Sequence, residues 1–245
     1  MTGELLFISD LHLSADRPLI SRHLFDFLRG PAAEAEALYI LGDLFDSWIG
    51  DDAIDAFSAE VIAALARLSG SGVGLYIQHG NRDFLLGEAF CEQTGAVLIG
   101  EQTCLQLGEQ RVLLMHGDLL CSDDLDYQQA RQMLRDLGFI ADFLSKPLAQ
   151  RRLLAEEYRR RSGEAISRKP AAIMDANPHS VSAYLAQHQA QLLIHGHTHR
   201  PGRQPQRLVL GAWEEDGACC LRWKDGQFEL FDYPANGQQI TRQTQ

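Results

Sequence analysis

Short apolar runs that stop abruptly at polar motifs constrain the fold of this chain more than any other feature. The runs cover residues 5–9, 38–41, 73–78, 112–115, 192–195 and 208–211. Runs of this length are typical of buried strands in α/β proteins. Segments with helical periodicity, at residues 18–28 and 54–68, separate the first three runs. This order predicts a layered α/β fold, and the alternating segment 207–232 predicts antiparallel strands that close the sheet.

Five motifs of Asp, Asn and His follow directly on predicted strands. They are D-L-H at 10–12, G-D at 42–43, G-N-R-D at 80–83, H-G-D at 116–118 and G-H-T-H at 196–199. The carboxyl ends of strands in open α/β sheets meet along one edge, where ligands bind. A single Asp after a strand is usually a helix cap, and a single Gly is usually a turn. The joint occurrence of five compatible motifs therefore indicates a functional site.

The side chains in these motifs are of the types that bind metal ions. Carboxylate, carboxamide and imidazole ligands suit Mn²⁺, Fe, Zn²⁺ or Mg²⁺, whereas a thiolate-rich site is excluded. The seven candidate ligands are Asp10, His12, Asp43, Asn81, His116, His197 and His199. Seven ligands are too many for one ion and suit two ions about 3.5–4 Å apart that share a water. Asp43 is the expected bridge, and the two residues of D-x-H and of H-x-H should point the same way from an extended segment.

Residues 127–174 interrupt the strand and helix pattern and have helical propensity throughout. We expect a helical insert there, with a catalytic core formed by residues 1–126 and 175–245. Eight of the 22 Lys and Arg residues of the chain lie between Lys146 and Lys169, beside apolar residues such as Phe143 and Leu144. The insert is predicted to form a lid with an apolar and a basic face. A small bundle packed only on itself is the alternative, because apolar stripes on helices usually serve a core.

The overall composition bears on the partners and location of the chain. With 33 acidic and 22 basic side chains, the net charge of -11 would repel nucleic acid, which is not expected as a partner. Five scattered cysteines without a C-x-x-C pair predict a reducing compartment such as the cytoplasm. The first ten residues lack the basic region of a secretory signal, and no apolar stretch approaches the ~20 residues that cross a bilayer. We therefore expect neither export by such a signal nor a membrane span.

Together the five motifs resemble the signature of the calcineurin-like metallophosphoesterases over residues 8–199. The resemblance implies a four-layered α/β/β/α sandwich and hydrolysis by two metal ions. It also implies how the ligands divide. One ion would be bound by Asp10, His12, Asp43 and His199, and the other by Asp43, Asn81, His116 and His197.

Arg82 departs from the common G-N-H-[DE] form of the third motif, in which a histidine stands at this position. The usual proton donor is therefore absent, and the identity of any general acid stays open. An arginine keeps its proton near neutral pH but offers a planar fork for phosphate oxygens, so we expect Arg82 to stabilise charge. The predicted catalytic residues are thus Asp43, Asn81 and Arg82. A surface ion pair between Arg82 and Asp83 is the alternative.

Longer motifs narrow the resemblance to the family of lipid A pathway pyrophosphatases that hydrolyse UDP-2,3-diacylglucosamine. These motifs include Y-I-L-G-D-L-F at 39–45, H-G-N-R-D-F-L-L-G at 79–87 and I-H-G-H-T-H-R-P at 194–201. The resemblance implies Mn²⁺ as the metal and attack by an activated water on the uridine-bearing phosphorus, which releases UMP and 2,3-diacylglucosamine 1-phosphate. It places substrate contacts at Asn81, Arg82, Asp124, Ser162, Lys169 and His197.

Three further expectations accompany this resemblance. Ile166 stands where the family pattern has a polar side chain, so the substrate contact made at that position is not expected here. Asp124 has an alternative role as a helix N-cap. The chain should attach peripherally to the anionic cytoplasmic face of the inner membrane, with no obligate protein partner inferred. The competing functions are a nucleotide or phosphoprotein phosphatase with the same two-ion cluster, and a non-catalytic scaffold.

Overall fold

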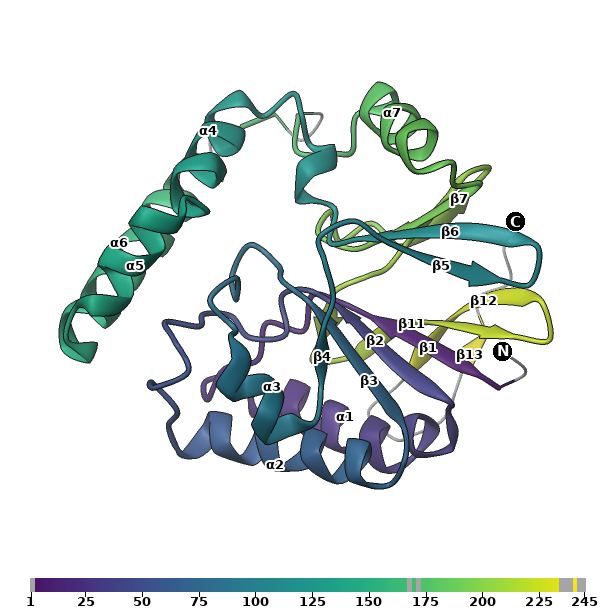
Figure 1. The fold of residues 1–245 in the computed structure, drawn as a ribbon, viewed down its shortest axis with the longest axis horizontal. Coiled ribbons are helices and arrows are strands. Elements are labelled where there is room, and N and C mark those ends of the chain that lie inside the picture. Colours follow the sequence, from purple (N-terminus) through teal and green to yellow (C-terminus); the bar gives the residue numbers. More distant parts are fainter. Residues whose placement is uncertain (1–2, 167–168, 171–172, 234–239, 242–245) are drawn as a thin grey trace.

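Two β-sheets face each other in the computed structural model, with helices on their outer sides (Figure 1). The structure describes residues 3–166, 169–170, 173–233 and 240–241. Within those residues, eight strands form the first sheet and five form the second. The resulting order of layers is helix, sheet, sheet, helix, as the family resemblance implies.

The first sheet has a parallel centre and an antiparallel flank. Its parallel strands are β1 (Leu5–Ile8), β2 (Ala37–Leu41), β3 (Gly74–Gln78) and β4 (Val97–Leu98). Its antiparallel strands are β10 (Trp213–Glu214), β11 (Gly217–Lys224), β12 (Gln227–Tyr233) and β13 (Ile240–Thr241). Strand β11 joins the two groups by pairing antiparallel with β1, so the C-terminal strands close this sheet as predicted.

Helices α1 (Pro18–Arg29), α2 (Ala56–Gly70) and α3 (Glu88–Thr94) cover the outer face of the first sheet (Figure 1). Pro18 occupies the first turn of α1, where a missing N–H costs nothing. The N-cap Asp55 accepts the Ser58 N–H while the Ser58 hydroxyl accepts the Asp55 N–H, so a capping box starts α2. The short 3₁₀ helix Pro31–Glu34 leads from α1 into β2.

The second sheet has the order β5 (Thr103–Leu107), β6 (Gln110–Met115), β7 (Leu192–His195), β9 (Arg207–Val209) and β8 (Gly202–Gln204). Helix α7 (Pro178–His188) covers its outer face (Figure 1). The prediction that residues 207–232 form antiparallel strands closing the first sheet is wrong for the first of these strands, β9. Strand β9 pairs parallel with β7 in this second sheet, because the chain crosses over before it returns to the first sheet at β10.

Three groups of buried apolar side chains correspond to the three interfaces between the four layers. One lies between α1, α2 and the first sheet, and includes Phe27 and Ile40. A second lies between the two sheets and includes Phe7 and Ile194. The third packs Leu185 of α7 against the second sheet. Apolar packing therefore holds the two sheets face to face and the helices against their outer faces.

The helical insert consists of α4 (Leu125–Leu134), α5 (Leu137–Ser145) and α6 (Leu148–Ile166). These helices extend away from the sheets and cover neither sheet face (Figure 1). Phe143 is buried and stacks with Phe139, whereas Leu137 is 82% exposed and Leu125 is 68% exposed. The insert is therefore too thin to bury all of its apolar side chains. In the described residues, no helix is long and apolar enough to cross a membrane.

The basic cluster of the insert is largely neutralised by neighbouring carboxylates. Six of its seven described members form ion pairs, and Arg152 is the exception. Arg159 and Arg151 reach across to Asp46 and Asp52 of the core. Arg168, the eighth member, lies outside the described residues. The predicted basic face consequently has far less free charge than its composition indicates.

Candidate metal centre

All seven predicted ligands lie where strands of the two sheets end, as the motif positions predict. Asp10 and His12 follow β1, Asp43 follows β2 and Asn81 follows β3. His116 follows β6 of the second sheet, and His197 and His199 follow β7. The loops continue the pairing of their strands, because the N–H groups of Asp10 and His12 donate to the carbonyls of Gly42 and Asp43. The backbone N–H of His197 donates to Asp10 Oδ2 at 2.8 Å and ties the two sheets together.

Five of these ligands have a left-handed backbone. Of the seven non-glycine residues with positive φ in the described part of the chain, five are Asp10, His12, Asp43, His197 and His199. Such conformations are uncommon outside glycine and cluster at functional sites. The expectation that D-x-H and H-x-H are extended is therefore wrong. Each pair is turned toward the centre by two left-handed residues.

The ligands that the family resemblance assigns to the first ion form one compact group. Asp10, His12 and His199 present ligand atoms that all lie within 4.8 Å of one another. His12 Nε2 lies 3.3 Å from His199 Nε2 and 3.7 Å from Asp43 Oδ2. His199 Nε2 lies 3.3 Å from Asp10 Oδ1. Nitrogen and oxygen atoms this close, facing one another, surround a position that a cation could occupy.

The ligands assigned to the second ion gather around Asn81. The Asn81 Oδ1 atom lies 3.0 Å from His116 Nε2 and 2.9 Å from His197 Nδ1. His116 donates from Nδ1 to the Leu41 carbonyl at 2.9 Å, which turns its Nε2 toward the site. That Nε2 lies 3.7 Å from Asp43 Oδ2, and Asp43 is also near His12 of the first group. Asp43 is thus placed to bridge two ions.

Glycine permits the close approach of the loops that carry these ligands. A Cβ atom on Gly42 would lie 2.6 Å from the Gly80 Cα and 2.6 Å from His116 Nδ1. Gly42 also has φ +89°, which L side chains rarely adopt. The glycine of the G-D motif is therefore a requirement of the site's geometry.

The carboxylate of Asp83 connects two of the ligand loops by accepting hydrogen bonds from their backbones. It is fully buried and accepts four backbone N–H groups, from Asp43 (3.2 Å), Leu44 (2.7 Å), Phe45 (3.3 Å) and Gly80 (2.8 Å). An ion pair with Arg82, the alternative considered for that residue, is absent from the described structure. Asp83 instead connects the loop of Asp43 to the loop of Asn81.

The electrostatics of the centre show a strong negative potential. Burial raises the pKa of Asp43, and the nearby carboxylates of Asp83 and Asp10 raise it further. Burial opposes charge on His116, but Asp43, Asp10 and Asp118 outweigh it and raise the pKa of His116 to about 9. Burial lowers the pKa of His12 to about 3, and burial with the charge of His116 lowers the pKa of His197 to about 4. The imidazoles of His12 and His197 are therefore neutral near pH 7, whereas His116 would give up its proton when a divalent cation binds.

A further observation supports the binding of a metal pair by these residues. The Asp10 Oδ1 atom is buried and makes no hydrogen bond in the described part of the chain. His199 Nε2 lies 3.3 Å from this oxygen, and a cation bound between the two would offset the free-energy cost of burying the carboxylate charge. The donor set contains no thiolate and is oxygen and nitrogen throughout, as the sequence predicts.

Arg82 lies half-buried beside the first group of ligands. Its backbone N–H donates to Asp43 Oδ1 at 2.8 Å, and its charge contributes to lowering the pKa of His12. Among the described residues no carboxylate forms an ion pair with the Arg82 guanidinium. The position is compatible with binding a phosphate oxygen at the centre.

The predicted substrate contacts of the insert are only partly brought together. Lys169 Nζ donates to both carboxylate oxygens of Asp124, at 2.6 and 2.8 Å, so these two residues bind each other. Asp124 also accepts the Tyr127 N–H and is the N-cap of α4, which was its alternative role. Ser162 is exposed on α6. The side chain of Ile166 lies outside the described residues.

Sequence reasoning missed a group of residues that connects the insert to the centre. Asp118, the acid of the H-G-D motif, is buried and accepts hydrogen bonds from Tyr127 and Arg131 of α4. Glu101 and Arg135 extend this group toward Gly80. Asp118 stood in a recognised motif, but neither arginine belongs to a motif, and only the fold brings them beside it.

The fold and this constellation of residues define a class of protein. The model of the calcineurin-like phosphoesterases matches residues 4–201, and the chain belongs to that family. The predicted fold class is thereby confirmed.

Within this family the chain is similar to proteins named UDP-2,3-diacylglucosamine hydrolase, as the longer motifs indicate. It is 46% identical over 237 residues to the one from Escherichia coli, covering 94% of this chain and 98% of the relative. The identity to the one from Cellvibrio japonicus is 46% over 222 residues, covering 87% and 92%. For Chromohalobacter salexigens it is 47% over 228 residues, covering 90% and 93%.

Proposed function

We propose that this chain hydrolyses the pyrophosphate bond of UDP-2,3-diacylglucosamine, giving UMP and 2,3-diacylglucosamine 1-phosphate in lipid A biosynthesis. The observation that carries the proposal is the near full-length similarity to relatives of that name, combined with a complete set of seven candidate ligands at the strand ends. A non-catalytic scaffold would have no need to keep five strained ligand residues.

Two divalent ions, when bound, would activate a water and neutralise the phosphates of the substrate. Asp10, His12, Asp43 and His199 would hold one ion, and Asp43, Asn81, His116 and His197 the other. Manganese is our choice of metal because the mixed imidazole and oxygen set suits a transition ion. The Asn81 carboxamide and His197 would also contact the substrate's phosphate.

Arg82 would stabilise the charge that grows on the pyrophosphate as its bond breaks. An arginine fork can contact two phosphate oxygens, and the guanidinium has no carboxylate partner in the described structure to compete for it. Lys169 would contribute similarly from the insert, after exchanging one oxygen of Asp124 for one of phosphate. Ser162 of α6 would contact the glucosamine part of the substrate. The attacked phosphorus would be the one that bears uridine.

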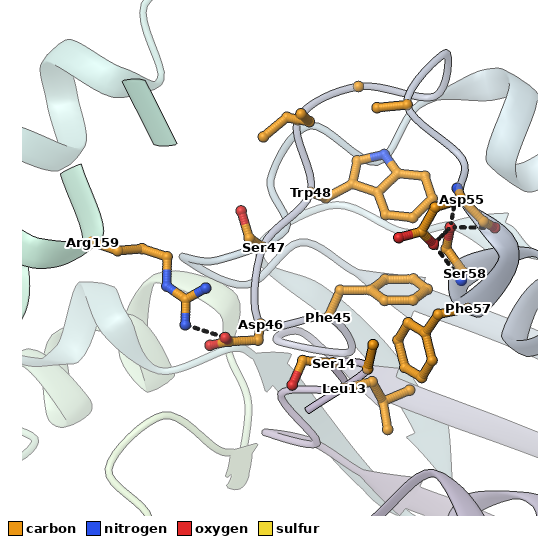
Figure 2. Close-up of a pocket in the computed structure, with 14 residues that line it drawn as sticks. Leu13, Ser14, Phe45, Asp46, Ser47, Trp48, Asp55, Phe57, Ser58 and Arg159 are labelled. Carbon is orange, nitrogen blue, oxygen red and sulfur yellow. Dashed lines mark hydrogen bonds and ion pairs between the residues drawn. The ribbon is translucent and has the colours of Figure 1, made fainter. Parts of the chain in front are cut away.

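A pocket beside the centre supports a substrate with an apolar part. It has a volume of about 180 Å³ and is lined by the loops after β1 and β2, the start of α2 and one residue of α6 (Figure 2). Its apolar walls include Leu13, Phe45, Trp48 and Phe57. Arg159 of α6 and Asp46 also line the pocket and form an ion pair with each other (Figure 2). We propose that this pocket takes part of an acyl chain, since each buried methylene contributes ~0.8 kcal/mol.

Peripheral attachment to the cytoplasmic face of the inner membrane belongs to the same proposal. Leu125, Leu137 and Leu153 of the insert are each at least two-thirds exposed. Since most basic residues of the insert are paired with carboxylates, apolar contact should contribute more to attachment than charge does. Sedimentation with anionic vesicles tests this. Leu137→Ser with Leu153→Ser should weaken binding more than high salt does, and unchanged binding in the double variant would contradict the proposal.

The experiment that tests the function is an assay of UMP release from UDP-2,3-diacylglucosamine in mixed micelles, with Mn²⁺. UMP, p-nitrophenyl phosphate and a phosphopeptide serve as comparison substrates. We expect turnover of the diacylated substrate to exceed that of the others by orders of magnitude. Hydrolysis of the phosphomonoesters alone would instead indicate a nucleotide or phosphoprotein phosphatase.

A further inference from the structure

Helix α4 contacts two of the loops that carry metal ligands, through side chains that no motif contains. Arg131 and Tyr127 project from the helix, and Arg135 is its C-cap residue. Both arginine side chains are largely buried, with 13% of Arg131 and 16% of Arg135 exposed. Long cationic side chains are rarely buried without partners, so their contacts identify what they hold.

Arg135 binds the loop that carries Asn81. Its Nη2 donates to the Gly80 carbonyl at 2.8 Å, and that carbonyl belongs to the peptide that joins Gly80 to Asn81. Its Nη1 lies 3.1 Å from Glu101, and its guanidinium lies 4.8 Å above the centre of the Phe84 ring. The Asn81 peptide is thus held by a guanidinium that is itself held on two sides.

Arg131 and Tyr127 bind the loop that carries His116. Arg131 Nε and the Tyr127 hydroxyl both donate to Asp118 Oδ2, at 2.6 and 2.8 Å. Asp118 lies two residues after His116, and its charge is one cause of the raised pKa of that histidine. Arg131 also pairs with Glu101 at 2.6 Å, so the two arginines share one carboxylate.

The third ligand assigned to the second ion also touches this helix. The ring of Tyr127 lies 5.9 Å from the ring of His197, centre to centre. In contrast, among the described residues, Asp10, His12 and His199 make no hydrogen bond or ion pair with α4 or Arg135. Among the described ligands, these interactions of the helix reach the ring of His197 directly, and they reach Asn81 and His116 through the neighbouring Gly80 carbonyl and Asp118 carboxylate.

We propose that α4, through Arg135, Arg131 and Tyr127, positions the ligands of the second ion and leaves the first ion's own ligands unaffected. This inference rests on the proposed two-ion function. The insert would then have two separate tasks. Its helix α4 is a fixed part of the metal centre, whereas α6 borders the apolar pocket.

A helix that merely docks the insert on the core is the competing explanation, and metal stoichiometry distinguishes the two. Binding of Mn²⁺ to the chelated full-length chain is measured by calorimetry, and the coupling of the two ions by electron paramagnetic resonance. The variants are Arg135→Met, Arg135→Lys and Tyr127→Phe. Arg29→Met is the matched control, because Arg29 also contacts one carboxylate and one backbone carbonyl, but at the end of α1.

We expect the wild type and Arg29→Met to bind two ions with a coupled signal. In Arg135→Met one ion should bind as in the wild type, while the other binds about 10- to 100-fold more weakly, the usual effect of losing a residue that orients ligands. Arg135→Lys should recover part of that affinity, and Tyr127→Phe should show a smaller selective loss. Measured kcat should fall when Mn²⁺ is limiting and recover at saturating Mn²⁺.

Two results would overturn the proposal. One is unchanged binding of both ions in Arg135→Met and Tyr127→Phe. The other is equal weakening of both ions, which would indicate a general loss of structure and should coincide with a lower melting temperature. If the wild type bound no metal pair and released no UMP, the proposed function itself would fail, and that outcome is separate from either result in the variants.

Discussion

Asp83→Asn is the substitution whose effect can be worked out most directly from the structure. Each carboxylate oxygen of Asp83 accepts one short and one long hydrogen bond. Oδ1 accepts from Gly80 at 2.8 Å and Asp43 at 3.2 Å, and Oδ2 accepts from Leu44 at 2.7 Å and Phe45 at 3.3 Å. An asparagine replaces one oxygen by an NH₂ group that faces two N–H donors. Whichever way the amide turns, one short and one long bond are lost.

The expected loss of stability follows from those two bonds. A buried donor left without a partner costs about 1–3 kcal/mol, so the variant should lose about 2–6 kcal/mol of unfolding free energy. Domains of this kind have about 5–15 kcal/mol in total. Because the two loops carry Asp43 and Asn81, the affinity for both ions should also fall, by about 10- to 100-fold.

The assay combines urea denaturation of the metal-free chain with Mn²⁺ titration of the folded variant. Asp51→Asn is the matched control. The Asp51 carboxylate likewise accepts hydrogen bonds from backbone and indole N–H groups, of Gly87, Phe90 and Trp48. These bonds lie further along the same two loops and involve neither Asp43 nor the peptide of Asn81. Both variants should be less stable, and only Asp83→Asn should bind metal more weakly. A loss of less than about 1 kcal/mol, the lower limit for one unpaired donor, or equal metal affinity in both variants, would refute the reasoning.

Three other predictions concern the reaction itself. Asp43→Ala should lower UMP release by at least about a thousandfold, because Asp43 Oδ2 lies 3.7 Å from both His12 Nε2 and His116 Nε2, one ligand of each group. Near-wild-type turnover with metal retained would exclude it as the bridge. After chelation, Mn²⁺ should restore activity far better than Ca²⁺, which prefers all-oxygen sites, and full activity with Ca²⁺ alone would show that the ligand set is wrong. Hydrolysis in ¹⁸O-water should label UMP, as mass spectrometry can detect, whereas label found only in the lipid phosphate would place the attack on the other phosphorus.

The strands and the ligand positions could be predicted because local sequence determines them. Residues 38–41 and 192–195 are apolar because they are buried on both faces, and β2 and β7 occupy nearly those bounds. A motif at a strand end falls at the edge of a sheet whatever the order of strands. The convergence of Asp10, Asn81 and His116 therefore did not depend on knowing the topology.

Other features depend on contacts between distant segments, which local patterns do not contain. The direction of β9 is set by its neighbour β7 and not by its own three residues. The sequence of the basic cluster predicts a cationic surface. The carboxylates that pair with it come from distant segments, because Asp46 and Asp52 of the core contact Arg159 and Arg151 only after folding. The roles of Arg131 and Arg135 were hidden for the same reason, since Glu101 and Gly80 are distant in sequence.

The strained ligands explain why so much of this fold is built around one edge. A left-handed conformation costs a non-glycine residue of order 1–3 kcal/mol. The five ligands together therefore store strain of about the same size as the unfolding free energy of a typical domain. Such strain persists only where surrounding contacts over-determine the conformation. The paired loop backbones, the absence of a Cβ at Gly42 and the four hydrogen bonds to Asp83 are contacts of that kind. The core therefore acts as a rigid frame that holds crowded carboxylates and imidazoles in place before any cation binds.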